Sequence, residues 1–408
     1  MAMFPNIPGS KSILQRVMVL SAHSKADITL QNYNPCADVL EMEAALKEYG
    51  YETEAKEDGM HFRFSIVKHE ASSHRYRFQE SATAFRLWLS LAANLKGARA
   101  TIELSEILCK RGYAPLQTAL EAMGAVFGIE DKLIRLRSCR LSGGKTQIDG
   151  SISSQYHSSL ILAAPFMQEE LLLPYGPAQV SLPYLKLSIQ ILRSFGAKIC
   201  KRGDYLRISR GKLCIPEHFR VDSDASTAAY YAALGALRPQ GIQISLALDP
   251  AYTQADMMIF DILADMGANV HWSDDICTIT PGRLISQRLD LKDAPDLMPI
   301  LSILALFCEG QTVVTGIARL ARKESNRVLG IRRALDRIGV KYEYGDDFLK
   351  IYPIADKDLL AVQLDTQYDH RLVMAFSLLR YRYPQISLTE TASLKKSIAY
   401  ANLGLTEP

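Results

Sequence analysis

Basic side chains lie within about a turn of several expected helix starts in this chain: Lys11, Arg16, Arg86 and Arg371. A cation at a helix N-terminus faces the positive end of the helix dipole, so it is unfavourable there unless an anion is shared with it. We therefore expect these helix starts to bind an anionic ligand. Arg would contact a phosphate or carboxylate through two N–H groups, and Lys would act as a point charge.

Further basic residues extend this candidate site: Arg111, Lys323, Arg327, Lys395 and Lys396. Taken singly, such residues are more often solvated surface charges than ligand contacts. If equivalent helix starts face one side of each domain, however, the cations converge in a cleft, where small-molecule sites commonly form. Two carboxylates, Asp296 and Glu324, fall among them and are the candidates for general acid and base.

Other chemistries find little support. The segment GlyGlyLysThr at 143–146 ends like a phosphate-binding P-loop, but Cys139 stands where the earlier Gly is required, so we expect a hairpin turn. The 8 histidines and 7 cysteines form no HExxH or CxxC pattern, and no GxSxG segment occurs. We expect neither a metal site nor a hydrolytic serine.

The helix starts that would position these side chains recur at steps of 71 to 73 residues. Each is a Ser or Asp, which accepts hydrogen bonds from the N–H groups that a helix start leaves unpaired, and a small apolar run follows each. The six are Ser10, Ser81, Ser153, Asp224, Asp296 and Asp369. The chain therefore reads as six repeats, each opening with a helix.

A second marker recurs with nearly the same period, an apolar segment ending in Gly at 124, 196, 267 and 339, with a looser copy at Gly50. Gly after a helical run is the usual C-cap signal. Alternating segments around polar turns then predict hairpins, as at 197–208 and 340–351. The period exceeds that of solenoid repeats, so we expect closed α/β domains rather than an open superhelix.

Composition limits the remaining choices. A chain of 408 residues is too long for one ordinary core and fits two domains of three repeats each. A net charge of +3 gives no electrostatic case for a nucleic-acid or membrane partner. The odd cysteine count indicates thiols in a reducing compartment, and no apolar stretch approaches the roughly 18 residues of a membrane span, so we expect a cytoplasmic protein.

Seven segments, in order over nearly the whole chain, resemble the 5-enolpyruvylshikimate-3-phosphate synthases: ProGlySerLysSerIleLeuGlnArg (8–16), SerSerGln (153–155), SerLeuProTyr (181–184), AspAlaSer (224–226), ProAsp (295–296), LysGluSerAsnArg (323–327) and AspHisArg (369–371). The resemblance implies a two-domain inside-out α/β barrel of six βαβαββ-like repeats, three per domain. We expect the domains at 10–221 and at 1–9 plus 222–408.

The same resemblance implies transfer of the enolpyruvyl group of phosphoenolpyruvate to the 5-hydroxyl of shikimate 3-phosphate, by a monomer without a cofactor. Shikimate 3-phosphate would contact Lys11, Ser12, Arg16, Ser153, Ser154, Gln155, Ser181, Tyr184, Asp296 and Lys323. Phosphoenolpyruvate would contact Lys11, Ala82, Arg111, Gln155, Arg327, Arg371 and Lys396.

Lys11, Asp296 and Glu324 are the catalytic residues that the resemblance implies. Asp296 would orient the 5-hydroxyl and accept its proton, and Glu324 would protonate the methylene carbon, for which it must itself be protonated. Which carboxylate performs which transfer is left open.

Several positions depart from the family pattern. Ala82 stands in place of the usual Gly at the phosphoenolpyruvate site, so we expect reduced sensitivity to the competing inhibitor glyphosate. Arg319 stands in place of an Asn that binds substrate in the family, and we do not transfer that role to it.

Two alternatives stay open. The UDP-N-acetylglucosamine enolpyruvyl transferases share the repeat fold, but their first motif is AlaLysAsn and here it is SerLysSer. A degenerate homologue that only binds an anion is the other alternative. Asp296 and Glu324 argue against it, because a binding protein needs no pair for proton transfer.

Overall fold

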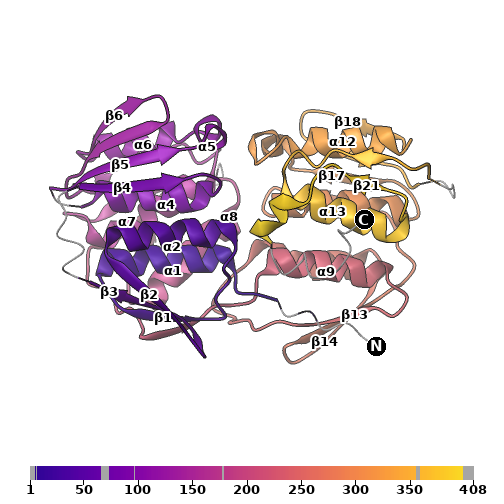
Figure 1. The fold of residues 1–408 in the computed structure, drawn as a ribbon, viewed down its shortest axis with the longest axis horizontal. Coiled ribbons are helices and arrows are strands. Elements are labelled where there is room, and N and C mark those ends of the chain that lie inside the picture. The colour runs from indigo at the N-terminus through magenta and orange to yellow at the C-terminus, as the bar shows by residue number, and fades with distance from the viewer. Residues whose placement is uncertain are drawn as a thin grey trace. The chain divides into compact units, whose positions relative to one another are not determined.

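The computed structural model describes residues 5, 7–65, 73–95, 97–176, 179–354 and 359–397, apart from the side chain of Arg322. The chain divides into two compact units (Figure 1). The N-unit comprises Gly9–Asp222 and Asp249–Thr253, and the C-unit comprises Met1–Pro8, Ser223–Leu248 and Gln254–Pro408. Most of the predicted segment 1–9, and everything after Ser397, lies outside the described residues.

The N-unit alternates helices and short strands. Its helices are α1 (Lys11–Ser24), α2 (Ala37–Tyr49), α4 (Ala82–Ala93), α5 (Glu106–Arg111), α6 (Ala114–Ala122), α7 (Ser154–Ala163) and α8 (Leu182–Ser194), with the 3₁₀ turn η1 (Ala164–Phe166). Its strands are β1 (Ile28–Gln31), β2 (Tyr51–Lys56), β3 (Gly59–Phe64), β4 (Ser73–Phe78), β5 (Arg99–Leu104), β6 (Val126–Glu130), β7 (Leu133–Arg137), β8 (Gly144–Lys145), β9 (Leu171–Pro174), β10 (Ile199–Arg202), β11 (Tyr205–Ile208) and β12 (His218–Arg220).

The three sheets of the N-unit in the described residues share one topology, a parallel pair whose inner strand also pairs antiparallel with one strand of a hairpin. Their strand orders are β4-β5-β7-β6, β8-β9-β11-β10 and β12-β1-β3-β2. In the last of these, β12 supplies the parallel partner of β1 from far along the chain, with Phe219 opposite Leu30.

The core of the N-unit is helical. Helices α1, α4 and α7 contact one another, and nearly every residue of α4 and α7 is buried. In Figure 1 the strands β1–β3 and β4–β6 lie on opposite sides of α1 and α4. A helix that is apolar on nearly all sides must be buried on nearly all sides, and the Ala- and Leu-rich sequence of α4 comes close to that condition.

The C-unit repeats these features. Its helices are α9 (Ala225–Leu237), α10 (Met258–Asp265), α11 (Met298–Leu304), α12 (Arg327–Arg337) and α13 (His370–Arg382), with the 3₁₀ turns η2 (Ala255–Met257), η3 (Pro295–Leu297), η4 (Ala305–Phe307), η5 (Ala318–Arg322) and η6 (Ala392–Lys396). Its strands are β13 (Ile242–Ser245), β14 (Asn269–Ser273), β15 (Ile276–Thr280), β16 (Arg288–Asp290), β17 (Thr312–Thr315), β18 (Tyr342–Tyr344), β19 (Phe348–Ile351), β20 (Gln363–Leu364) and β21 (Ser387–Leu388).

Only one sheet of the C-unit shows the full four-stranded pattern within the described residues, in the order β16-β17-β19-β18. The sheet β13-β15-β14 has no parallel partner for β13 in this part of the chain, and β20 and β21 form a parallel pair without a hairpin there. Helices α9, α11 and α13 contact one another, as α1, α4 and α7 do in the N-unit.

Most of the predicted helix starts are confirmed. The side chains of Ser81, Ser153, Asp224 and Asp369 each accept a hydrogen bond from a backbone N–H in the first turn of the helix that follows. Ser10 precedes α1 without such a bond.

A helical segment begins beside Asp296 as predicted, but the predicted capping role of Asp296 is wrong. This residue lies inside η3, after Pro295, and its carboxylate bonds to cationic side chains instead of capping a helix. Charge pairing therefore prevails over local capping at this position.

The predicted C-cap glycines and hairpins are confirmed, but one turn is not. Gly50, Gly124, Gly196, Gly267 and Gly339 all have positive φ at the ends of helices, and the hairpins β10–β11 and β18–β19 lie at the predicted segments. The expected hairpin turn at 143–146 is wrong, because Gly144–Lys145 form β8, which pairs in parallel with β9.

Candidate active site

Arg327 is the centre of the charged cluster in the C-unit. It is the first residue of α12, only 1% of its side chain is exposed, and it bonds three carboxylates. Its Nη1 donates to Asp296 Oδ1 at 2.6 Å, its Nη2 to Glu324 Oε2 at 2.7 Å and its Nε to Asp369 Oδ2 at 2.8 Å. Burial lowers the pKa of Arg327, but these carboxylates raise it by more, so the guanidinium stays charged.

Asp369 joins the start of α13 to this cluster. It is fully buried, accepts from the Ser325 hydroxyl at 3.0 Å and accepts from the backbone N–H of Arg371 at 3.0 Å. The sequence marked Asp369 as a helix cap and as part of the AspHisArg segment (369–371). Its second role, as the main partner of the Arg327 guanidinium, had no signal in local spacing.

Asp296 lies among three cations. Besides Arg327, it faces Arg371 Nη2 at 3.1 Å and Lys323 Nζ at 3.4 Å. Burial raises the pKa of Asp296, but Arg371, Lys323 and Arg327 together lower it by more, and the pKa lies well below its ordinary value of 3.8. Asp296 is therefore ionised at neutral pH in this state.

The C-unit has two further buried charged residues of interest, Lys396 and Asp256. Lys396, predicted from the sequence, ends η6, is 7% exposed and lies on an element that contacts α13. Asp256, which the sequence did not single out, is 2% exposed in η2 and accepts a hydrogen bond from the Ser226 hydroxyl. Burial raises the pKa of Asp256 to about 6, with Arg371 opposing the shift and Asp296 adding to it.

In the N-unit, the start of α1 is tied to α2. Lys11 Nζ bonds Asp38 Oδ2 at 2.8 Å, and both side chains are mostly buried. Gln15 Nε2 donates to the Asp38 carbonyl at 2.8 Å and to Ser81 Oγ at 3.0 Å. Lys11 thus has a carboxylate partner inside the chain, which the sequence did not reveal.

Arg16 is an interior residue. It is 2% exposed, and its guanidinium donates to Ser188 Oγ at 2.8 Å, to the Ser12 carbonyl at 2.7 Å and to the Tyr184 carbonyl at 3.2 Å. Burial lowers the pKa of Arg16 to about 10, so it remains charged at neutral pH. These bonds connect two predicted ligand residues, Ser12 on α1 and Tyr184 on α8.

Gln155 and Arg86 form a second polar group in the N-unit. Arg86 Nη1 donates to Gln155 Oε1 at 2.6 Å, and Gln155 Nε2 donates to Thr83 Oγ1 at 2.8 Å. Arg86 Nη2 also donates to the carbonyl of Arg111 at 2.9 Å. This chain of bonds places Gln155, at the start of α7, beside the start of α4 and the end of α5.

The remaining predicted residues of the N-unit lie at helix starts. Ser153 caps α7, where its hydroxyl accepts from Gln155 N at 3.3 Å, and Ser154 is the first residue of that helix. Ala82 is the first residue of α4 and is 2% exposed. Ser181 precedes α8 in the left-handed region, with φ of 53°. A non-Gly residue in that region is strained, and such strain concentrates at functional sites.

Two kinds of site are not seen in the described part of the chain. No group of three or more His, Cys, Asp or Glu side chains there is arranged to hold a metal ion. None of the helices described is both long enough and apolar enough to cross a membrane.

Known proteins resemble the chain over almost its whole length. The family model described as EPSP synthase (3-phosphoshikimate 1-carboxyvinyltransferase) matches residues 5–397. The chain is 28% identical to a 3-phosphoshikimate 1-carboxyvinyltransferase of Pasteurella multocida, covering 96% of this chain and 92% of the relative. It is 30% identical to one of Actinobacillus pleuropneumoniae, covering 92% and 89%.

Solved structures share the fold. An EPSP synthase from Acinetobacter baumannii superimposes with a TM-score of 0.76 at 22% identity, over 99% of this chain and 96% of that one. The enolpyruvyl transferase NikO from Streptomyces tendae superimposes with a TM-score of 0.75 at 16% identity, over 99% and 94%. At these identities the structures establish an α/β fold with mixed sheets, and the sequence matches establish kinship.

Proposed function

Because the chain belongs to the EPSP synthase (3-phosphoshikimate 1-carboxyvinyltransferase) family, we propose its charged clusters as the substrate-binding and catalytic groups of that reaction. The chain is a transferase that moves the enolpyruvyl group of phosphoenolpyruvate to the 5-hydroxyl of shikimate 3-phosphate and releases phosphate. The reaction belongs to the biosynthesis of chorismate and the aromatic amino acids. The observation that carries the proposal is the family match over residues 5–397, combined with the Asp296–Arg327–Glu324 cluster.

For shikimate 3-phosphate, we propose hydroxyl and amide contacts from the helix starts of the N-unit. Backbone N–H groups and hydroxyls at a helix start suit a phosphate group. The candidates there are Lys11, Ser12, Ser153, Ser154, Gln155, Ser181 and Tyr184, and those of the C-unit are Asp296 and Lys323. Arg16 was also predicted to contact this substrate. Because Arg16 is buried and bonds the carbonyls of Ser12 and Tyr184, it would act by holding these two residues in position.

For phosphoenolpyruvate, we propose Lys11, Ala82, Arg111 and Gln155 of the N-unit and Arg327, Arg371 and Lys396 of the C-unit. The cations suit the carboxylate and phosphate of this substrate. Ala82 is buried at the start of α4, where the family pattern has Gly. We propose that its methyl group reduces glyphosate sensitivity. Ala82→Gly should then lower the glyphosate concentration that halves activity, and an unchanged inhibition curve would refute this.

We propose that the two carboxylates of the C-unit move the protons. Glu324 gives a proton to C3 of phosphoenolpyruvate, the 5-oxygen bonds to C2, and Asp296 accepts the hydroxyl proton. In the second half, C3 returns a proton to Glu324, the C2–O bond to phosphate breaks, and the leaving phosphate takes the hydroxyl proton from Asp296. The products are the enol ether and inorganic phosphate, so atoms and charges balance.

The ion pairs suggest how substrate binding would change the proton affinities of Glu324 and Asp296. In the present state Arg327 bonds both side chains, and Arg371 bonds Asp296 as well. An anionic substrate bound by Arg327 and Arg371 would compete for the same N–H groups. Loss of those bonds favours protonation of Glu324 and makes Asp296 a stronger base.

Phosphate release on mixing the protein with shikimate 3-phosphate and phosphoenolpyruvate tests the proposal. Turnover should require shikimate 3-phosphate and should not occur with UDP-N-acetylglucosamine as acceptor. Asp296→Asn and Glu324→Gln should each lower kcat by about 10²- to 10⁴-fold, while Arg283→Gln, at an exposed ion pair with Glu309, should not. Ligand binding without turnover for either acceptor would instead identify a degenerate anion-binding homologue.

We also propose that the fold consists of six βαβαββ-like repeats, three in each domain, with domains at 10–221 and at 1–9 plus 222–408. The shared topology of four described sheets and the two sets of mutually contacting helices support it. That the protein acts as a monomer, without a cofactor and in the cytoplasm, stays a prediction.

A further inference from the structure

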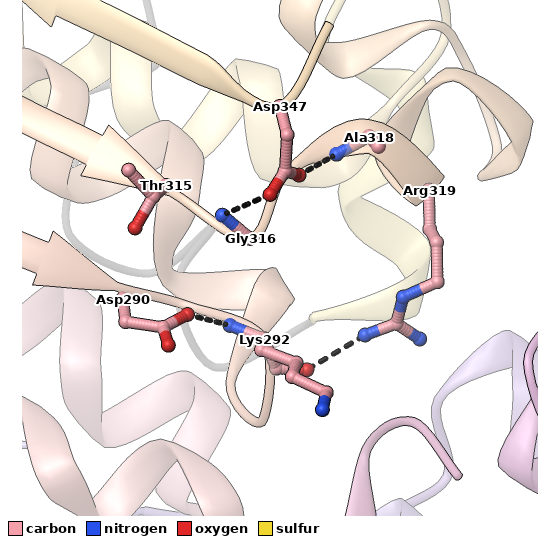
Figure 2. A pocket seen from close by; sticks show the side chains of 7 residues that line it. All are labelled: Asp290, Lys292, Thr315, Gly316, Ala318, Arg319 and Asp347. Carbon is pink, nitrogen blue, oxygen red and sulfur yellow. Dashed lines mark hydrogen bonds between the residues drawn. The ribbon is translucent and has the colours of Figure 1, made fainter. Parts of the chain in front are cut away.

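Two loops of the C-unit border a cavity of about 340 Å³ that the proposed mechanism does not use (Figure 2). The first loop follows β16, includes Lys292 and leads to Asp296. The second follows β17, includes Gly316 and Arg319, and leads to Lys323 and Glu324. The distance between these two loops therefore affects the positions of Asp296 and Glu324 relative to each other.

The backbones of the two loops run close together where they leave the sheet. Gly316 has φ of +76°, and a Cβ there would lie 2.4 Å from Lys292 N, so the two backbones approach too closely for a side chain. Asp290 Oδ1 accepts from Lys292 N at 2.9 Å. Asp347, in the β18–β19 turn, accepts from the N–H groups of Gly316 at 3.2 Å and Ala318 at 2.8 Å.

Farther from the sheet, Arg319 joins the loops across the cavity. Its Nη2 donates to the Lys292 carbonyl at 2.6 Å, and Figure 2 shows the side chain extended toward that oxygen. Atoms that face an open space have no van der Waals partners to hold their spacing. A charge-assisted hydrogen bond is strong enough to set the spacing instead.

The charge of Arg319 also acts on Asp296. Burial lowers the pKa of Arg319, while the negative charges of Asp293, Asp296 and Asp347 raise it. The interaction is mutual, so Arg319 favours the ionised form of Asp296. The other charged groups that face Asp296 are Arg371, Lys323, Arg327, Glu324 and Asp256.

We propose that Arg319 is a positioning residue that holds Asp296 in register with Lys323 and Glu324 by bonding the Lys292 carbonyl. The catalytic consequence rests on the proposed function, whereas the link between the loops does not. Sequence reasoning assigned no role to Arg319, because its only signal was the replacement of an Asn in the family pattern.

Three variants of the full chain test the inference. Arg319→Gln removes the charge and shortens the side chain, and Arg319→Lys keeps the charge but loses the planar guanidinium. Arg283→Gln is the matched control, because Arg283 belongs to the same unit but bonds the exposed Glu309. Steady-state kinetics over a range of pH measure the catalytic effect. Hydrogen exchange of the backbone amides of 291–296 measures the link without reference to activity.

We expect Arg319→Gln to lower kcat by roughly 10- to 100-fold, since a displacement of about 1 Å in a catalytic group can cost about 100-fold. KM for phosphoenolpyruvate should stay unchanged, and the acidic limb of the kcat profile should move to higher pH. Arg319→Lys should restore the acidic limb but not kcat. Both variants should speed exchange at 291–296, and Arg283→Gln should not.

Several results would overturn the inference. Exchange at 291–296 that matches wild type in both Arg319 variants would show that the bond does not hold the loop. Kinetics of Arg319→Gln that match those of Arg283→Gln would show that the loop spacing does not matter for catalysis. If Arg319→Gln fails to fold, Arg319→Lys carries the same two tests. A wild-type protein without turnover would refute the proposed function, while exchange would still decide the link.

Discussion

Several of the cations that the sequence assigned to a ligand are, in the structure, bonded to carboxylates of the chain itself. Lys11 pairs with Asp38, and Arg327 and Arg371 pair with Asp296. A guanidinium that is 1% exposed needs such partners, because an unpaired buried charge is very costly. The carboxylates therefore keep the site stable without substrate.

Replacement of Arg327 by Gln tests this balance. The change leaves Asp369, Asp296 and Glu324 without their shared cation, and breaking a buried pair in this way costs about 3–5 kcal/mol. We expect that loss in the free energy of unfolding from urea denaturation at pH 7. The loss should shrink as the pH falls, because unpaired carboxylates take up protons.

Arg283→Gln is the control for that measurement, since its partner Glu309 and its own side chain are both exposed. It should leave the free energy of unfolding nearly unchanged. A similar small effect for Arg327→Gln would show that the buried cluster contributes little to stability.

For Asp256 we expect the opposite dependence of the free energy of unfolding on pH. Burial raises its pKa from 3.8 to about 6, so between these values the folded state holds a proton that the unfolded state has lost. Stability from this proton is complete below about pH 4 and is lost as the pH rises through about 6. Asn cannot ionise, so Asp256→Asn should become more stable than wild type on going from pH 4 to pH 7, by up to about 3 kcal/mol.

Thermal unfolding of wild type and variant at both pH values measures this difference. Asp261→Asn, at an exposed position of α10, is the control. A difference between Asp256→Asn and wild type that does not depend on pH would contradict the prediction.

At the scale of the elements, the sequence predicted the features that depend on only a few neighbouring residues, namely helix caps and the glycines that end helices. Cap residues such as Ser81 and Asp224 form their bonds within four residues of themselves, so their spacing in the sequence was enough. The glycines after helices followed for the same reason, because positive φ is a property of one residue.

The partners of the buried charged side chains depend on contacts between elements that are distant in the sequence, so the sequence did not predict them. Asp296 was expected to cap a helix, but cations from two later segments take its carboxylate. Asp38 and Asp256 lie in elements with no motif, and nothing near them in the sequence indicates a cationic neighbour. Arg16 was expected at a ligand, and that contact stays a prediction; the hydroxyl and carbonyl groups of α7 and α8 that bond its guanidinium had no signal in the sequence.

The start of α8 offers a test of strain against binding. Ser181 holds φ of 53°, and the left-handed region costs an L-residue about 1–2 kcal/mol. Ser181→Gly should therefore raise the free energy of unfolding, by about 1 kcal/mol after the entropy cost of Gly. It should also raise KM for shikimate 3-phosphate, because the proposed hydroxyl contact is lost.

Ser181→Ala separates the two effects in urea denaturation and steady-state kinetics. It removes the hydroxyl but keeps the strain, so KM should rise without a gain in stability. If the Gly variant is no more stable than the Ala variant, the backbone at this position is not strained.

At the scale of the whole molecule, each unit has its own sheets and its own set of mutually contacting helices. The chain has two tryptophans, one in each unit. Trp88 is fully buried in the N-unit, and Trp272 in the C-unit packs on Phe260 with ring centres 5.0 Å apart.

We expect two unfolding transitions that these tryptophans report separately. In a Trp272→Phe background, fluorescence follows the N-unit, and in a Trp88→Phe background it follows the C-unit. Arg327→Gln should lower the midpoint in the second background and leave the first unchanged. Equal shifts in both backgrounds would mean that the units unfold as one.

The pairing of β12 with β1 has a consequence for synthesis on the ribosome. Strand β1 can pair with β3 soon after it emerges, but its other edge waits for β12. The intervening chain from Ile28 to His218 is about 190 residues, which takes roughly 10–40 s to translate at about 5–20 residues per second. During that interval β1 is an open sheet edge, the kind of surface at which nascent chains pair wrongly with one another.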